Sequence, residues 1–326
     1  MGHDKRFLLH IGANKTGTSS IQTMLAANPE PLAAAGWRYP DFHRSYGAHH
    51  ALAYSIGGLG RGLRHDWESE LRALLADRET RFVFSSEPFL RLVDPEHVAR
   101  FFPPGETLVV VYLRDHLSYM MSWYAQAVQE RNVTASFEDY VQLFSAPLSG
   151  FLARWDAVYG RANVELRLFD RATLADGDVR RDFAQFIDGL DPGTLEWPEK
   201  ESNPSISGNL LFFKRLLNNY MTREEAEGPP IPDEFGAYAD VKPTFRGKFR
   251  VTAREATMVR RVFTDDIRAL RRRGLPLGRL PESVDGVQVP DFATLRTDTQ
   301  DIKRIAEETG KAFLTYAERW QDWHAL

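Results

Sequence analysis

The chain has 326 residues, enough for one large α/β domain or two small ones. A hydrophobic fraction of 43% and an aromatic fraction of 12% are those of a globular protein with a sizeable core. A net charge of −4 gives no general preference for nucleic acid, and the absence of cysteine excludes disulfides, thiolate metal sites and cysteine nucleophiles.

The chain carries no sign of membrane insertion or export. No apolar run approaches the roughly 20 residues that a membrane-spanning helix needs. The N-terminus lacks a hydrophobic signal core, and Arg6 does not fit a myristoylation motif. We therefore expect a cytoplasmic protein without stable membrane insertion.

Apolar runs that alternate with helical patterns predict an α/β fold. The predicted strands lie at 6–12, just after Gly36, and at 81–87, 106–115 and 163–170. The predicted helices between and after them lie at 18–28, 49–59, 67–78, 118–130, 137–144, 151–160 and 178–190. This alternation indicates βαβ units around a mostly parallel sheet of about five strands.

The strand signals fade after about residue 195. We expect an amphipathic helix after the turn at "SNPSISG", a Pro- and Gly-rich excursion or lid over 224–249, and two further helical stretches at 251–273 and 297–326. Thr252 and Glu255 form a capping-box pattern at the start of the first of these stretches. We thus expect one domain over 1–326, with its core at about 5–195 and a helical, loop-rich part at about 200–326.

A glycine-bounded loop follows the first predicted strand. Gly12 and Gly17 have the spacing of the phosphate-binding motif G-x-x-x-x-G-K-[ST], but Thr18 follows Gly17, and Lys15 lies inside the loop. A strand, a turn and a helix start gather backbone N–H groups around one point, where Lys15 adds a full positive charge. Hydroxyl donors come from Thr16, Thr18, Ser19 and Ser20. The loop therefore predicts a site for phosphate or phosphosulfate, and a capped turn with incidental hydroxyls is the structural alternative.

A second phosphate-binding candidate follows the strand at 106–115. Arg114 lies at the carboxyl end of this strand, where ligands collect in open α/β sheets, and its planar guanidinium can bind phosphate through two hydrogen bonds. Ser118 and Ser122 are one helical turn apart, so one of them can complete the site. An ion pair between Arg114 and Asp115, and plain packing of Ser122, are the structural alternatives.

These two motifs together resemble the PAPS-dependent sulfotransferases, in particular their bacterial branch. "HIGANKTGTSSIQ" is similar to the 5′-phosphosulfate loop of that family, and "YLRDHLSYMMSWY" supplies an arginine and a serine eight residues apart, as in its 3′-phosphate site. The likeness covers roughly residues 5 to 215. The resemblance implies a P-loop-like three-layer αβα fold. It also implies that the donor is held by Asn14, Lys15, Thr16, Gly17, Thr18, Ser19, Ser20, Arg114 and Ser122.

The activity that this resemblance implies is transfer of a sulfuryl group from PAPS to a hydroxyl or amine, which releases adenosine 3′,5′-bisphosphate (PAP). The acceptor is a small molecule, a carbohydrate or a lipid-linked compound, and no metal is expected. Lys15 would stabilise charge on the leaving phosphate oxygen. Neither the acceptor nor the oligomeric state follows from the sequence.

Three residues are candidates for the base or for acceptor contacts. Glu87 ends the strand at 81–87 and resembles the implied base of carbohydrate-modifying branches of the family. His49 is the alternative base, because imidazole titrates near neutrality, and His50 beside it is a candidate acceptor contact. An exposed strand-end carboxylate and structural histidines are the other interpretations.

Two other functions stay open at this point. A P-loop kinase that acts on a small molecule with Mg-ATP would fit the glycine spacing, although the displaced lysine and the lack of a clear Walker B aspartate count against it. A non-catalytic nucleotide-binding protein would use the same loop without turnover.

Overall fold

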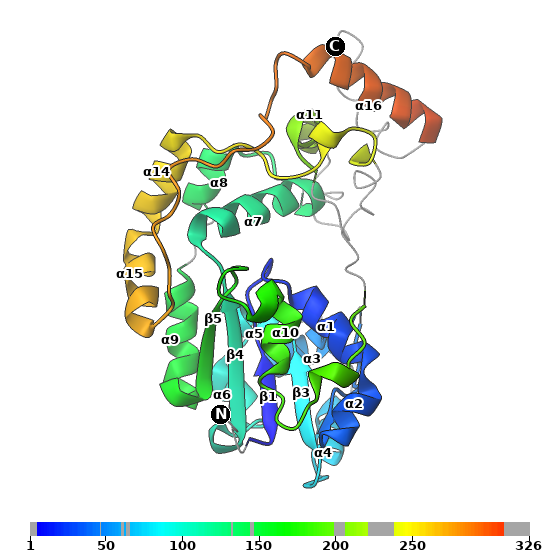
Figure 1. Ribbon diagram of the computed structural model, residues 1–326, viewed down its shortest axis with the longest axis vertical. Coiled ribbons are helices and arrows are strands. Elements are labelled where there is room, and N and C mark those ends of the chain that lie inside the picture. Colours follow the sequence, from blue (N-terminus) through cyan, green and yellow to red (C-terminus); the bar gives the residue numbers. More distant parts are fainter. Residues whose placement is uncertain are drawn as a thin grey trace. The chain divides into compact units, whose positions relative to one another are not determined.

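The computed structural model of the chain describes residues 5–45, 47–59, 62, 66–131, 133–143, 147–198, 206–220 and 238–309 (Figure 1). The chain divides into two compact units. The first comprises Met1–Asp115, Pro147–Lys200 and Asp265–Gly278, and the second comprises His116–Ala146, Glu201–Thr264 and Arg279–Leu326. The expectation of one domain over 1–326 stays a prediction.

A five-stranded sheet with the order β2-β3-β1-β4-β5 forms the centre of the first unit. Every neighbouring pair of strands is parallel. The strands are β1 (Phe7–His10), β2 (Trp37–Arg38), β3 (Arg81–Ser85), β4 (Thr107–Leu113) and β5 (Val164–Leu168). All five lie within or beside the predicted strand segments, and the α/β fold with a parallel sheet is confirmed.

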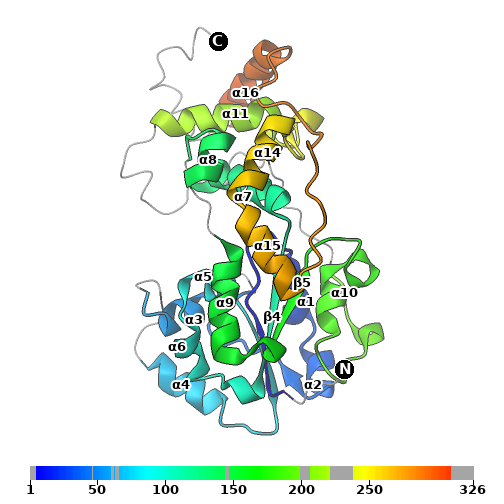
Figure 2. The ribbon, with the colours of Figure 1, turned by 90° about the vertical axis from the view of Figure 1, so that its left-hand side faces the viewer.

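Helices cover both faces of this sheet, which gives the first unit three layers (Figure 2). One face carries α1 (Thr18–Ala27), α2 (Pro29–Ala34) and α10 (Val179–Ala184). The other face carries α3 (His50–Ile56), α4 (Trp67–Leu74), α5 (Pro88–Leu92), α6 (Pro95–Ala99) and α9 (Leu148–Tyr159). Helix α15 (Thr264–Arg273) returns to this unit, where Arg273 forms a bidentate ion pair with Asp156 of α9. Short 3-10 turns lie at Pro104–Glu106, Arg161–Asn163, Ala175–Gly177 and Pro192–Thr194.

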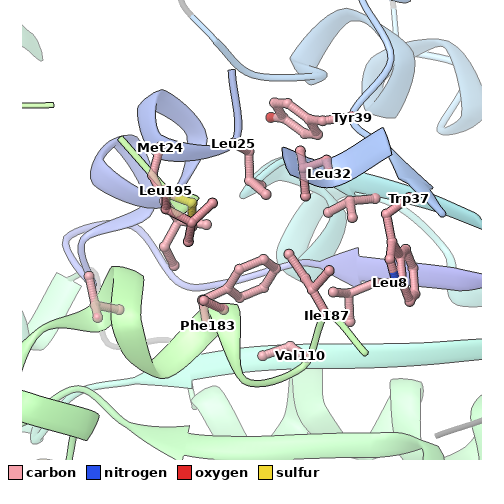
Figure 3. Packing of buried hydrophobic residues seen from close by; sticks show 14 of the residues in the cluster. Leu8, Met24, Leu25, Leu32, Trp37, Tyr39, Val110, Phe183, Ile187 and Leu195 are labelled. Atoms are coloured by element: carbon pink, nitrogen blue, oxygen red, sulfur yellow. The ribbon is translucent and has the colours of Figure 1, made fainter. Parts of the chain in front are cut away.

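The core on the α1 side of the sheet is a cluster of buried apolar side chains (Figure 3). Alternate residues of β4, Leu108, Val110 and Tyr112, face it because successive side chains of a strand point to opposite faces. They pack with Leu8, Met24, Leu25, Leu32, Phe183 and Ile187 from β1, α1, α2 and the α10 region. Each such side chain contributes about 1.5–3 kcal/mol when it is fully buried, so this packing fixes α1, and the loop before it, against β1 and β4.

The described part of the second unit is mainly helical, with extended segments joined by isolated β-bridges such as Val251–Val284. Its helices are α7 (His116–Arg131), α8 (Phe137–Leu143), α11 (Gly208–Leu217), α14 (Ala253–Val262) and α16 (Leu295–Thr309), and its 3-10 turns are Asn218–Tyr220 and Pro243–Phe245. The expected helical C-terminal part is thus confirmed. The predicted capping box is present, because Thr252 and Glu255 each accept a hydrogen bond from the other's backbone N–H.

A buried carboxylate ties α11 and α16 of the second unit together. Asp298 accepts hydrogen bonds from Asn209 Nδ2 at 2.7 Å, Thr294 Oγ1 at 2.8 Å and Lys242 Nζ at 2.8 Å. Of the predicted excursion, 224–237 lies outside the described residues, as do 310–326 of the predicted last helix. None of the described helices is long and apolar enough to cross a membrane.

Candidate active site

The loop between β1 and α1 follows the sheet before it turns. Ile11 N donates to Val110 O at 3.1 Å and Ala13 N donates to Tyr112 O at 3.2 Å, so the chain stays alongside β4 beyond the end of β1. It then turns at Lys15, whose φ of 65° is in the left-handed region that non-glycine residues rarely adopt. Thr16 Oγ1 donates to Ala13 O at 2.6 Å and closes the turn. The first amide groups of α1 follow, and these have no carbonyl partner within their own helix.

Both the backbone conformation of Gly17 and its close neighbours favour glycine at this position. Its φ of 75° is left-handed, and it is the N-cap residue of α1. A Cβ at Gly17 would lie 2.8 Å from Cγ1 of Val179 and 2.9 Å from the ring of Phe169. These two residues, which follow β5 in the sequence, therefore leave no room for a side chain at position 17.

Arg114 lies directly after β4 and reaches this loop. Its guanidinium donates to Lys15 O at 3.5 Å and lies 5.7 Å from the centre of the Phe169 ring. Burial lowers the pKa of Arg114, and the nearby Asp115 and Asp170 oppose that shift. The structure thus brings a second cation to the loop that carries Lys15.

Glu87 lies two residues beyond β3, on the other side of β1 from Arg114. Its side chain is 9% exposed. Oε1 accepts a short hydrogen bond from the Thr18 hydroxyl. Oε2 lies 3.3 Å from Gln22 Nε2, which donates to it, and 3.5 Å from His50 Nε2. Because Thr18 is the first residue of α1, the candidate base is joined directly to the candidate donor loop.

The two histidines of the doublet have different surroundings. His49 is buried; its Nε2 lies 3.0 Å from Pro40 O, and its Nδ1 accepts from Ser85 N at 3.3 Å. Burial lowers the pKa of His49 to about 3. Both ring nitrogens are therefore engaged by the backbone, which disfavours His49 as the base. His50 has a side chain that is 36% exposed, and its Nδ1 lies 2.9 Å from Ser86 Oγ.

The remaining predicted residues divide between the two units. Asn14 and Ser20 are half-buried and Ser19 is exposed, all at the loop or the first turn of α1. Ser118 and Ser122 lie on α7 of the second unit, where Ser122 is half-buried. The pairing of Ser122 with Arg114 stays a prediction.

Two residues of the site were not singled out from the sequence. Gln22 is 3% exposed, and its Nε2 donates to Ser85 Oγ at 3.1 Å as well as to Glu87. His10, the last residue of β1, is 1% exposed, and its Nδ1 lies 2.8 Å from the same Ser85 Oγ. Gln22 follows Thr18 by four residues, a spacing that places both on one face of a helix and was the available signal.

Comparison with known proteins gives distant likenesses. No family model matches the sequence. An uncharacterized protein of Archaeoglobus fulgidus is 29% identical over 141 residues, which are 42% of this chain and 38% of that protein. The match therefore spans well under half the length of this curated relative.

Two solved structures are similar to this chain. One is a sulfotransferase from Alicyclobacillus acidocaldarius, with 18% identity and a TM-score of 0.40 over 60% of this chain and 87% of that one. The other is retinol dehydratase in complex with androsterone and the inactive cofactor PAP, with 15% identity and a TM-score of 0.32 over 86% of this chain and 84% of that one.

Proposed function

We propose that this chain is a sulfotransferase that moves a sulfuryl group from PAPS to a hydroxyl or amine of a small-molecule, carbohydrate or lipid-linked acceptor. The observation that carries the proposal is the joining of three groups at the carboxyl edge of the sheet. A phosphate-type loop follows β1, Arg114 reaches it from the end of β4, and Glu87 bonds to it from the end of β3. An anion site with a carboxylate in direct contact is what proton-coupled group transfer requires.

The donor side of this proposal rests on fixed positive charge. The loop brings together the first amide groups of α1 and the charges of Lys15 and Arg114. Ser19 and Ser20, in the first turn of α1, add hydroxyl groups. These groups fit an anionic phosphosulfate, and Gly17 has no side chain that would fill the turn. PAPS would supply the sulfuryl group, and Lys15 with the loop amides would stabilise the charge that develops on the leaving phosphate oxygen. Arg114 and Ser122 would hold the 3′-phosphate.

The acceptor side rests on Glu87. Its carboxylate takes the proton of the acceptor hydroxyl as the acceptor oxygen bonds to sulfur and the bond from sulfur to the phosphate oxygen breaks. Gln22 and His50 hold Oε2 from two directions, which keeps the carboxylate in one orientation. His50 is the more exposed of these two partners and is therefore the candidate contact for the acceptor.

The kinase alternative is less well supported by the same contacts. The residue that would be the Walker lysine is Thr18, and its hydroxyl is bonded to Glu87. A nucleotide-binding protein without turnover remains the second candidate, because the loop and Arg114 would serve binding alone equally well.

Incubation of the purified protein with PAPS and a panel of hydroxyl and amine acceptors tests the proposal. Release of PAP that depends on an acceptor, together with the mass increase of a sulfuryl group on that acceptor, is expected. Binding of PAP without release from PAPS for any acceptor would favour the non-catalytic alternative. Consumption of Mg-ATP in place of PAPS would favour the kinase.

A further inference from the structure

The Thr18 side chain presents its two branches to different sides of the site. Its hydroxyl donates to Glu87 Oε1. Its methyl carbon Cγ2 faces the loop, because it would lie 3.2 Å from a Cβ placed on Gly12. In helices, threonine commonly occupies two χ1 rotamers, so one rotation can bring the hydroxyl toward the loop.

Glu87 does not depend on Thr18 for its orientation. Its other oxygen, Oε2, has Gln22 Nε2 at 3.3 Å and His50 Nε2 at 3.5 Å. Gln22 is itself fixed by Ser85 Oγ at 3.1 Å, and Ser85 Oγ lies 2.8 Å from His10 Nδ1. Loss of the Thr18 hydrogen bond would therefore open Oε1 without releasing the carboxylate.

His10, the last residue in this series of contacts, also lies next to the loop. Nε2 of His10 is buried and has no hydrogen-bond partner among the described residues, and a Cβ on Gly12 would lie only 2.7 Å from it. A buried polar group that lacks a partner is costly, and such groups are rare in folded proteins. One cluster thus contains the side chains of His10, Ser85, Gln22, Glu87 and Thr18. It adjoins the loop at two points, through His10 next to Gly12 and through Thr18 at the start of α1.

We propose that Thr18 couples occupation of the loop to the availability of the base. In the structure, the Thr18 hydroxyl is held by Glu87 Oε1. When an anion fills the loop, the hydroxyl turns to the anion, and Oε1 becomes able to accept the acceptor's proton. Gln22 is the positioning residue that keeps Glu87 in place during this exchange. The inference rests on the proposed function, in which the loop holds the donor and Glu87 is the base.

A double-mutant cycle on anion affinity tests the exchange without an acceptor. The proteins are the wild type, Thr18→Val, Glu87→Ala and the double variant, titrated calorimetrically with PAP and, separately, with inorganic pyrophosphate. In the wild type the hydroxyl must leave Glu87 to reach the anion, so Thr18→Val should weaken binding by no more than about 2-fold. In the Glu87→Ala background the hydroxyl is already released, and Thr18→Val should weaken binding by about 5- to 10-fold.

Two controls separate this coupling from a structural role. Thr18→Ser keeps the hydroxyl, so it should not change anion affinity either in the wild-type protein or in the Glu87→Ala variant. Ser19→Ala removes an exposed hydroxyl from the same turn, and its effect should be equal in both backgrounds. If Thr18→Val does not fold, as judged by its melting transition, Thr18→Ala takes its place in the cycle.

An equal loss of affinity on Thr18→Val with and without Glu87 would overturn the coupling. A wild-type protein that binds pyrophosphate but not PAP would instead contradict the proposed donor, and the cycle would then be decided with pyrophosphate. A wild-type protein that binds neither anion would contradict both.

Discussion

The guanidinium of Arg114 donates a hydrogen bond to the carbonyl oxygen of Lys15 at 3.5 Å. This contact joins two motifs that are 99 residues apart in the sequence and that were each assigned to a phosphate on separate grounds. It also holds the turn in which Lys15 adopts a left-handed backbone. The loop and the end of β4 therefore form one composite cationic site.

Lys15→Ala should lower the rate of sulfuryl transfer at least ~100-fold, because one preorganised charge at the leaving oxygen is lost. The measurement is PAP release from PAPS with any acceptor found in the panel. Lys5→Ala is the matched control, since Lys5 precedes the other end of β1 and donates to the carbonyl oxygen of Gly105, away from the loop. Near-normal turnover of Lys15→Ala would remove Lys15 from the mechanism.

Glu87→Gln should bind PAP about as well as the wild type but transfer roughly 100- to 10,000-fold more slowly, which is the usual contribution of a positioned base. The readouts are calorimetry for binding and single-turnover transfer for the rate. Glu96→Gln, on the exposed side of α6, is the control. An active Glu87→Gln protein together with an inactive His49→Ala protein would move the base to the histidine.

Gly17→Ala should destabilise the protein more than Gly58→Ala does. Both glycines have positive φ values, 75° and 65°, so each substitution carries a backbone cost of about 1 kcal/mol. Among the described residues a Cβ at Gly58 meets nothing within 4 Å, whereas one at Gly17 meets Val179 and Phe169. Overpacking of this kind costs about 1–3 kcal/mol more. Equal losses in the free energy of unfolding, measured by urea titration, would show that Val179 and Phe169 do not confine position 17.

Stability should fall as the pH drops below the ordinary pKa of histidine. Burial lowers the pKa of His10 from 6.5 to about 4. The unfolded state therefore binds the proton first on acidification. The contribution of neutral His10 to the free energy of unfolding is fully present above about pH 6.5 and is lost progressively down to about pH 4. Between about pH 7 and about pH 5, His10 should account for a loss of about 2 kcal/mol.

The contribution of His10 can be separated by substitution. His10→Asn should reduce the pH dependence of the free energy of unfolding, while His97→Gln, at an exposed position on α6, should leave it unchanged. An unaltered slope in His10→Asn would mean that His10 is not neutral in the folded protein.

The sequence was sufficient for the elements whose signal is local. Continuous apolar runs predict β1, β3 and β4 because strands buried on both faces need no alternation. The capping box at Thr252 and Glu255 is likewise a local pattern, and the structure contains it. The short helices α5 and α6 were missed, although each begins with a proline at its first position, which is a recognised start signal.

The contacts of the site join segments that are distant in the sequence, and no local pattern predicts them. Gln22 meets Ser85 and Glu87 across 63 and 65 residues, and His10 meets Ser85 across 75. Only the register of β1 against β3, which pairs His10 with Ser85, brings these side chains together. The reason for glycine at position 17 is similar, because Phe169 and Val179 approach it from beyond β5.

The most direct test of the central claim is calorimetric titration of the purified protein with PAP, with ATP and magnesium in parallel. The account predicts tight binding of PAP that does not depend on metal and that falls at least ~10-fold in Arg114→Ala, since a charged hydrogen-bonding partner of phosphate is removed. Arg171→Ala, at an exposed arginine of the same unit, should bind as the wild type does. A preference for magnesium-ATP, or PAP binding that is indifferent to Arg114, would contradict the account.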